Sequence, residues 1–349
     1  MQKNSKPVAT WIGIGVLMLL IQVVLGGVTR LTGSGLSITE WNVITGTIPP
    51  LNENAWIAEF DKYRQTPQYQ LVNIHFTLSD FKFIYFWEWF HRLWARLIGV
   101  VFIIGFVYLL VKRYLKREMV APLLILFLLG ALQGAVGWIM VASGLTGDAV
   151  YVKPTRLAMH FIFALVLIAY AFWFFLELTV PSRDRMISPK IRSFTAWLLL
   201  LVTIQLIFGA LMAGHKAATA APTWPDINGS MLPSSTFATK PFLLNFIENK
   251  ITVHFVHRNL AYLILALTVA YTWMLYSFKT GSSTFNFFKV IPITLVVAQV
   301  ALGIFALITS PGIVPNKWGA FDWLAQLHQV AGMLFALSLV GLMFLVRRR

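Results

Sequence analysis

Glu88-Trp89-Phe90-His91-Arg92 leads directly into an apolar run that extends from Leu93 to Val111. Glu88, His91 and Arg92 share one face of a helix, and the run that follows is about long enough to cross a bilayer. Titratable groups are costly inside a membrane and commonly mark functional sites there. The stretch therefore predicts a membrane helix with a functional site near one end.

The whole chain has the composition of a membrane protein. Of its 349 residues, 58% are hydrophobic and 12% are charged, and the mean hydropathy is +0.73. Apolar windows of about 20 residues predict eight spans, at 9–28, 90–111, 121–142, 157–178, 194–214, 252–277, 288–309 and 323–346. We expect an all-α polytopic membrane protein with eight transmembrane helices.

The net charge of +15 arises largely from short connections between the predicted spans. Lys and Arg gather at 112–117, 183–192, 279–289 and 347–349, with Lys3 and Lys6 near the start. This is the positive-inside pattern rather than a nucleic-acid surface. We expect both termini in the cytoplasm, the long connections 29–88 and 215–251 outside, and, with too few leading residues for a transit peptide, a bacterial plasma (inner) membrane.

Cysteine is absent from the chain. Its absence excludes disulfides, cysteine-ligated iron–sulfur clusters and c-type heme attachment. A metal site would have to use histidine, methionine or carboxylate ligands.

The chain repeats itself. At an offset of 183 the first and fifth spans match, and at 166 to 168 the later spans match, with the pairs Gln22/Gln205, Gly26/Gly209, His91/His257, Arg92/Arg258, Gln133/Gln299, Gly137/Gly303 and His160/His328. We expect two tandem, pseudo-symmetric four-helix bundles, residues 1–185 and 186–349, with the same orientation in the membrane. Each odd-numbered span carries Gln-x-x-x-Gly, which we interpret as a helix-packing element.

Four histidines recur at equivalent positions, each in about the first turn of its predicted even-numbered span. One such histidine alone would be an ordinary interfacial residue. Four of them, two in each half, are typical of a bundle that holds heme by axial ligation from facing helices. The predicted pairs are His91 with His160 and His257 with His328, near the outer face; His75 and His215 have no repeat partner and are expected to be solvated.

The neighbours of these histidines suggest further roles. Arg92 and Arg258 are candidates for binding heme propionates, and the alternative is that they snorkel to the interface. Glu88 is replaced by His254 in the second half, so the first half is expected to be catalytic and the second to transfer electrons. Glu88 could instead pair with Arg92, and His254 could compete with His257 as a ligand.

The first outer connection has structure of its own. Trp56, Phe60 and Tyr63 follow helical spacing, which predicts an amphipathic helix at 54–65 on the outer leaflet, above the first heme pocket. Thr77 and Asp80 predict a capping box that starts a helix leading into the second span.

Many of these motifs together resemble the heme A synthase family, in its longer proteobacterial and mitochondrial type. The resemblance is carried nearly along the whole chain by the run Gly-Gly-x-Thr-Arg-Leu-Thr-x-Ser-Gly-Leu-Ser at 26–37, Trp41, Gly46 to Pro50, Phe60 to Tyr63, Phe81 to Ile84, Glu88, His91-Arg92, Gly137-Trp138, Ser143 to Leu145, Arg156 to His160, Thr223 to Pro225, His257-Arg258 and His328-Gln329. The outer-loop cysteine pairs of shorter relatives are missing, and the loop from Gly214 to Pro233 fits loosely.

The resemblance implies that the protein is an oxidoreductase that converts the methyl group of heme O into the formyl group of heme A by two successive hydroxylations. It implies a catalytic Glu88, substrate-heme ligands His91 and His160, and heme b ligands His257 and His328. Heme O synthase, an electron donor and cytochrome oxidase as recipient would be its partners, and a homo-oligomer stays open. The alternatives are a di-heme b-type cytochrome that only carries electrons and a heme carrier protein.

Overall fold

A computed structural model describes residues 6–40, 45–314 and 317–347. Its long helices, together with the short α10, are α1 (Lys6–Leu31), α4 (Leu78–Val111), α5 (Arg117–Ala142), α6 (Pro154–Thr179), α7 (Pro189–His215), α9 (Lys250–Ser277), α10 (Ser283–Phe288), α11 (Ile291–Thr309) and α12 (Ala320–Leu345). Within the described residues, eight helices are long and apolar enough to cross a membrane, α10 and α11 together forming the seventh span. The predicted all-α multi-pass fold is confirmed.

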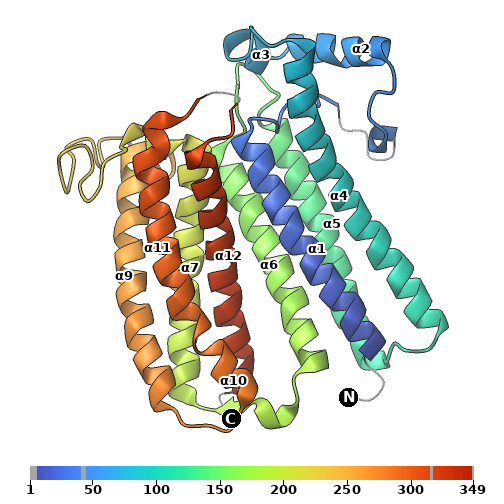
Figure 1. The fold of residues 1–349 in the computed structure, drawn as a ribbon, viewed down its shortest axis with the longest axis vertical. Coiled ribbons are helices and arrows are strands. Elements are labelled where there is room, and N and C mark those ends of the chain that lie inside the picture. The colour runs from blue at the N-terminus through green and yellow to red at the C-terminus, as the bar shows by residue number, and fades with distance from the viewer. Residues whose placement is uncertain (1–5, 41–44, 315–316, 348–349) are drawn as a thin grey trace.

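The long helices stand side by side, with α12 and α6 between the remaining helices of the two halves, as Figure 1 shows. In the first half α1 contacts α4 and α6, and α5 contacts α6; in the second half α7 contacts α9 and α12, and α11 contacts both α9 and α12. The halves meet where α6 contacts α7 and where α12 reaches α1 and α6. Because α12 is the most enclosed span, with 61% of its apolar window buried against 6% for α4, it forms the centre of the molecule.

Apolar side chains fill each half toward the end that carries the chain termini. Val8, Ile12, Met119, Leu123 and Phe174 form one buried cluster of the first half. The second half has its own, made by residues such as Ile191, Leu198, Tyr271, Leu339 and Leu342. The short parallel strands β1 (Met186–Ile187) and β2 (Val346–Arg347) fasten the chain end to the link between α6 and α7.

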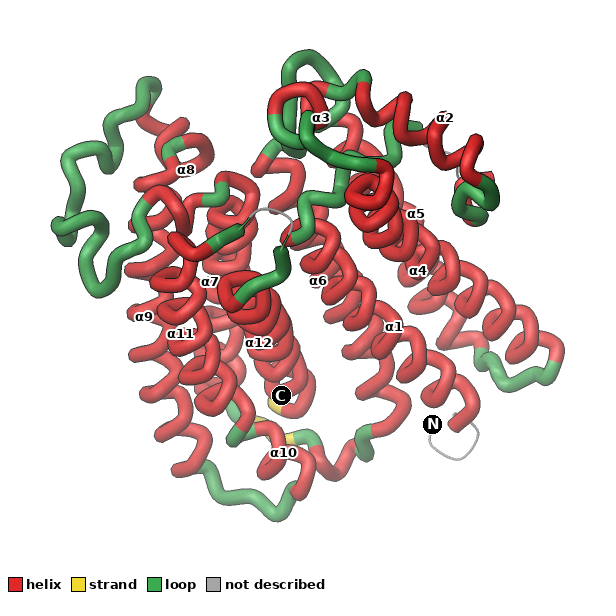
Figure 2. Tube along the Cα trace, turned by 45° about the horizontal axis from the view of Figure 1, so that its top comes forward, coloured by secondary structure: helices red, strands yellow, loops and turns green. Residues whose placement is uncertain are grey.

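Both ends of the described chain lie at one end of the bundle, and the longer connections lie at the other (Figures 1 and 2). The end opposite the termini carries the short helices α2 (Glu53–Arg64), α3 (Pro67–Leu71) and α8 (Asn245–Glu248). It also carries the 3-10 turns η2 (Thr45–Thr47), η4 (Ala217–Ala220), η5 (Phe242–Leu244) and η6 (Ser310–Gly312). The turn η3 (Ser182–Asp184) lies at the end that carries the termini. Trp41 lies outside the described residues.

The predicted amphipathic helix and capping box are both present. α2 begins at Glu53, and its Phe60 and Tyr63 stack on Phe81 of α4. Thr77 and Asp80 exchange the hydrogen bonds of a capping box, so α4 starts at Leu78, well outside the apolar window that begins at 90. The first twelve residues of α4 therefore extend beyond the predicted apolar span, and their packing against the aromatic residues of α2 stabilises them. A hydropathy window does not detect this part of the helix, because it contains polar residues.

Candidate functional site

A cavity of about 1050 Å³ runs between the two halves of the molecule. The four repeated histidines line it together with the glutamine and glycine of each Gln-x-x-x-Gly motif. Ligand pockets for drug-sized molecules measure roughly 300–1000 Å³. The cavity is therefore large enough for a large planar ligand, and both halves contribute to its walls.

His257 of α9 and His328 of α12 face each other across the second half. Their ring centroids lie 6.3 Å apart and the ring planes are inclined by 73°. Two imidazoles that bind one metal ion through a single nitrogen each would have centroids about 6 Å apart, since each metal–nitrogen bond is about 2 Å long. The donor set and its spacing thus fit a heme iron held from both sides.

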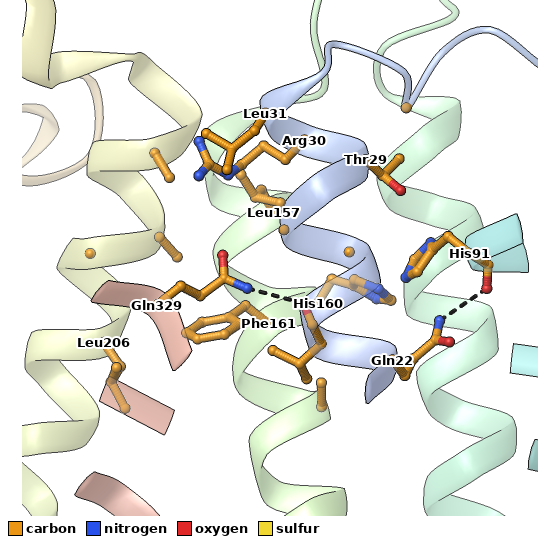
Figure 3. Close-up of a pocket in the computed structure, with 18 of the residues that line it drawn as sticks. Gln22, Thr29, Arg30, Leu31, His91, Leu157, His160, Phe161, Leu206 and Gln329 are labelled. Atoms are coloured by element: carbon orange, nitrogen blue, oxygen red, sulfur yellow. Dashed lines mark hydrogen bonds between the residues drawn. The ribbon is translucent and has the colours of Figure 1, made fainter. Parts of the chain in front are cut away.

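His91 of α4 and His160 of α6 form the corresponding pair in the first half. Figure 3 shows both rings beside α1, directed into the cavity, and they are close enough to interact electrostatically. The four helices begin at Leu78, Pro154, Lys250 and Ala320. Each histidine therefore lies roughly two turns inside its helix, and His91 more than three, which corrects the expectation of a position in the first turn.

Glu88 lines the same cavity and is 2% exposed. Its carboxylate accepts hydrogen bonds from the Ser37 hydroxyl at 2.7 Å, the Ile38 main-chain N–H at 2.9 Å and Arg92 at 2.5 Å. The pairing of Glu88 with Arg92 is therefore real. Ser37, the last residue of the 26–37 run, and the adjacent Ile38 hold the carboxylate in place. Sequence reasoning did not connect either residue with Glu88.

His254 occupies the position that Glu88 has in the first half. It is 3% exposed, and its Nε2 lies 3.4 Å from Nη2 of Arg258, one turn further along α9. His257, not His254, faces His328.

Arg92 and Arg258 hold loops at the end of the bundle opposite the chain termini. Arg92 donates to the main-chain carbonyls of Ile38 and Glu40, at 3.2 Å each. Arg258 donates to the carbonyls of Thr223 (2.9 Å), Pro225 (3.1 Å) and Asp226. Both arginines line the cavity, but these contacts direct much of each guanidinium group to the backbone.

A third arginine, Arg30, reaches the cavity where the halves meet, and sequence reasoning missed it (Figure 3). Its Nε is buried and has no hydrogen-bond partner among the described residues, while Asp322 of α12 interacts with it electrostatically. The signal was present in the 26–37 run. No pattern in one chain, however, showed that α1 would place this residue against the second half.

The outer end of the cavity is covered by loops and by α3. Gln68 lines the cavity, accepts a hydrogen bond from Tyr63, and lies 3.4 Å from the Val150 carbonyl. Burial raises the pKa of Tyr63 to about 12, so its hydroxyl stays a donor. None of the described lining residues belongs to α2, so the helix predicted to cover the pocket lies to its side.

The other two histidines lie outside this cavity lining. His75 is exposed, as expected. His215 is half-buried, and its Nε2 lies 2.6 Å from the Ile247 carbonyl at an exposed position, so this side chain is partly solvated and also contacts the chain.

Comparison with known proteins now identifies the family. A family model described as "Cytochrome oxidase assembly protein" matches residues 9–340. The chain belongs to this family.

Three similar curated proteins carry one name. A protein of Flavobacterium psychrophilum called "Heme A synthase" is 41% identical over 94% of this chain and 94% of its own length. Proteins of the same name from Flavobacterium johnsoniae and Methylorubrum populi are 38% and 40% identical, over 97% and 93% of this chain and 98% and 83% of their own lengths. The resemblance drawn from the motifs is confirmed.

Proposed function

We propose that this protein is a heme A synthase, which oxidises the methyl group of heme O to the formyl group of heme A for a terminal oxidase. Its family and the name of its relatives support the class of reaction. The observation that carries the proposal is one cavity, lined by both halves, into which four histidines point: His257 and His328 face each other, and His91 and His160 lie together on the other side.

In this proposal His91 and His160 bind the substrate, heme O, while His257 and His328 bind a resident heme b. A bound heme b would supply one-electron redox chemistry. Both pairs lie along one cavity, so the second half would serve electron transfer to the first. We therefore assign the substrate-heme site to residues 1–185 and the heme b site to residues 186–349. The packing of α6 on α7 and of α12 on α1 and α6 would fix the distance between the two sites.

Glu88 would act in the first half as a fixed negative charge. Three hydrogen-bond donors surround the carboxylate, and one of them, Arg92, is a cation, an arrangement that stabilises a negative charge. In an enclosed site such a charge stabilises positive charge that develops nearby during a reaction. We propose that it favours oxidation at the substrate methyl through two successive hydroxylations, followed by loss of water from the resulting gem-diol. Each hydroxylation would take its oxygen atom from dioxygen, with two electrons from the donor reducing the second oxygen atom to water, or from water, with two electrons passing to an acceptor.

Arginines would bind the acidic groups of the substrate. Arg92 and Arg258 stay candidates for propionate binding, and we add Arg30, whose Nε is free to donate. Guanidinium groups bind carboxylates with charge-assisted hydrogen bonds. The contacts of Arg92 and Arg258 with loop carbonyls favour Arg30 as the more available donor.

The proposed location and partners follow from the fold and the reaction. A bacterial inner membrane with both termini cytoplasmic would place the cavity near the outer face, since its lining includes loop residues at the end opposite the termini, such as Tyr151, Lys216 and Ile313. Heme O synthase would supply the substrate, an electron donor would act as co-reactant, and cytochrome oxidase would receive the product.

Extraction of the pigment tests the proposal against the two alternatives. The purified protein, produced beside a heme O synthase, is expected to release heme B together with heme A, whether or not unconverted heme O is also present. A di-heme electron carrier would release heme B alone, and a heme carrier would release heme O without ever forming heme A.

A further inference from the structure

Each of the four cavity histidines packs against a glycine on the preceding span. A methyl group placed on Gly303 would lie 2.8 Å from Cε1 of His328, and one on Gly137 would lie 2.9 Å from Cε1 of His160. The corresponding distances are 3.2 Å from Gly26 to Nε2 of His91 and 3.2 Å from Gly209 to Cε1 of His257. The four imidazoles therefore occupy space that any larger residue would fill.

The glutamine one turn before each glycine contacts the same histidine. Nε2 of Gln22, Gln133 and Gln205 donates to the main-chain carbonyls of His91, His160 and His257, at 3.2, 3.1 and 3.0 Å. Gln299 differs. Its main-chain carbonyl oxygen lies 2.9 Å from Nδ1 of His328, and its side-chain amide nitrogen lies 3.3 Å from Nε2 of the same ring. A main-chain carbonyl can only accept, so Nδ1 of His328 carries the proton and Nε2 the lone pair.

Several buried polar atoms of the glutamines and histidines have no hydrogen-bond partner within the part of the chain that the structure describes. The side-chain carbonyl oxygens of Gln22, Gln133, Gln205 and Gln299 are all buried without a hydrogen-bond partner among the described residues, and so is Nδ1 of His257. A histidine that binds a metal through Nε2 generally donates its Nδ1–H to a nearby acceptor, which fixes the ring and makes it a stronger ligand. At His257 an unsatisfied acceptor on Gln205 and an unsatisfied ring nitrogen belong to residues already in contact.

We propose that the Gln-x-x-x-Gly motif of each odd-numbered span is the positioning element for the histidine of the span that follows. The glycine provides the space for the imidazole. Gln22, Gln133 and Gln205 hold the main chain of their histidines, and the buried carbonyl oxygen of Gln205 is the acceptor that we assign to Nδ1–H of His257 when Nε2 binds a metal. Our interpretation of these motifs as simple helix-packing elements is then too narrow. The inference rests on the proposed heme ligation and assigns residues to it.

Glycine variants test the steric part. Gly137→Ala and Gly303→Ala do not weaken a helix, because alanine is the better helix former. Gly137→Ala is expected to alter the low-spin optical and electron paramagnetic resonance spectra of the first-half heme, and Gly303→Ala those of the second-half heme. Ala135→Ser, which adds one atom to the same helix as Gly137 at an exposed position, is the matched control and is expected to keep wild-type spectra.

A glutamine variant tests the hydrogen bond. Gln205→Leu removes the acceptor at Nδ1 of His257, which makes the imidazole a weaker donor to iron. We expect a raised midpoint potential for the second-half heme, while Gln205→Glu, which keeps an acceptor, lowers it. A purely structural role for Gln205 would not move the potential in opposite directions in the two variants.

The outcomes separate the inference from the function. A wild-type protein that binds heme, together with glycine variants of unchanged spectrum and heme content, would overturn the positioning role and leave the proposed function standing. Unchanged potentials in both Gln205 variants would overturn the hydrogen-bonding part. A wild-type protein that binds no heme would overturn both the inference and the function on which it rests.

Discussion

Oε1 of Glu88 lies 2.5 Å from Nη2 of Arg92, one turn further along the same helix. The second half repeats this relationship with His254 and Arg258, 3.4 Å apart. In both halves the arginine also holds an outer loop through main-chain carbonyls. The repeated part is therefore the clamp between helix and loop, and the carboxylate is what distinguishes the first half.

Glu88→Gln should leave heme content close to that of the wild type and abolish heme A formation. The amide can still contact Ser37 and Arg92, so the pocket stays formed, but the negative charge is lost. Pigment extraction from cells that also produce heme O synthase measures both quantities. Glu59→Gln, on the surface of α2 where Glu59 pairs with Lys62, is the control; normal heme A yield from Glu88→Gln would remove Glu88 from the mechanism.

His328→Ala should remove the second-half heme and leave substrate heme bound in the first half. Its ring faces His257 and no other described cavity histidine stands in its place. The heme B content per protein should fall strongly while heme O is retained. His75→Ala, at an exposed position, serves as control, and full retention of heme B would show that His328 is not a ligand.

Arg30→Gln should weaken binding of the substrate heme more than it weakens folding. The change removes a cation from the cavity, and a charge-assisted hydrogen bond is worth about 1.5–3 kcal/mol, or roughly tenfold or more in affinity. Titration of purified protein with heme O measures the loss. Arg64→Gln, which alters an exposed pair with Asp61, should bind as the wild type does; equal affinity in both variants would exclude Arg30 from propionate binding.

Arg258→Lys should loosen the loop at 223–226. A lysine cannot satisfy three separate carbonyls with the geometry of a guanidinium group, and Arg258 is only 8% exposed. We expect a loss of roughly 2–3 kcal/mol of unfolding free energy and faster proteolysis of this loop. Arg117→Lys, at an exposed position, should change neither, and an equally resistant loop in Arg258→Lys would refute the clamp.

Sequence reasoning reached the spans and the histidines for a physical reason. Bilayer-length apolar runs are detectable in one chain, and a repeat aligns His91 with His257 without any structure. The contact of Glu88 with Ser37 and Ile38 could not be found in this way, because it joins a helix to a loop about 50 residues away. Nor could the place of Arg30, which depends on how α1 packs on α12.

The helix at 53–64 shows a different limit. Its amphipathic spacing predicted the helix correctly, and its aromatic face does pack on α4. The spacing of apolar residues predicts which face of a helix is buried, but not which part of the protein surface the helix covers. The cavity is covered instead by Gln68 and the loop residues around Leu36 and Val152.

The most direct test of the account is the heme composition of the purified wild-type protein, produced together with a heme O synthase and analysed by chromatography and mass spectrometry. The account predicts heme B together with heme A, in protein whose spectra show iron held by two histidines. Heme B alone, with no heme A in protein or membranes, would contradict it.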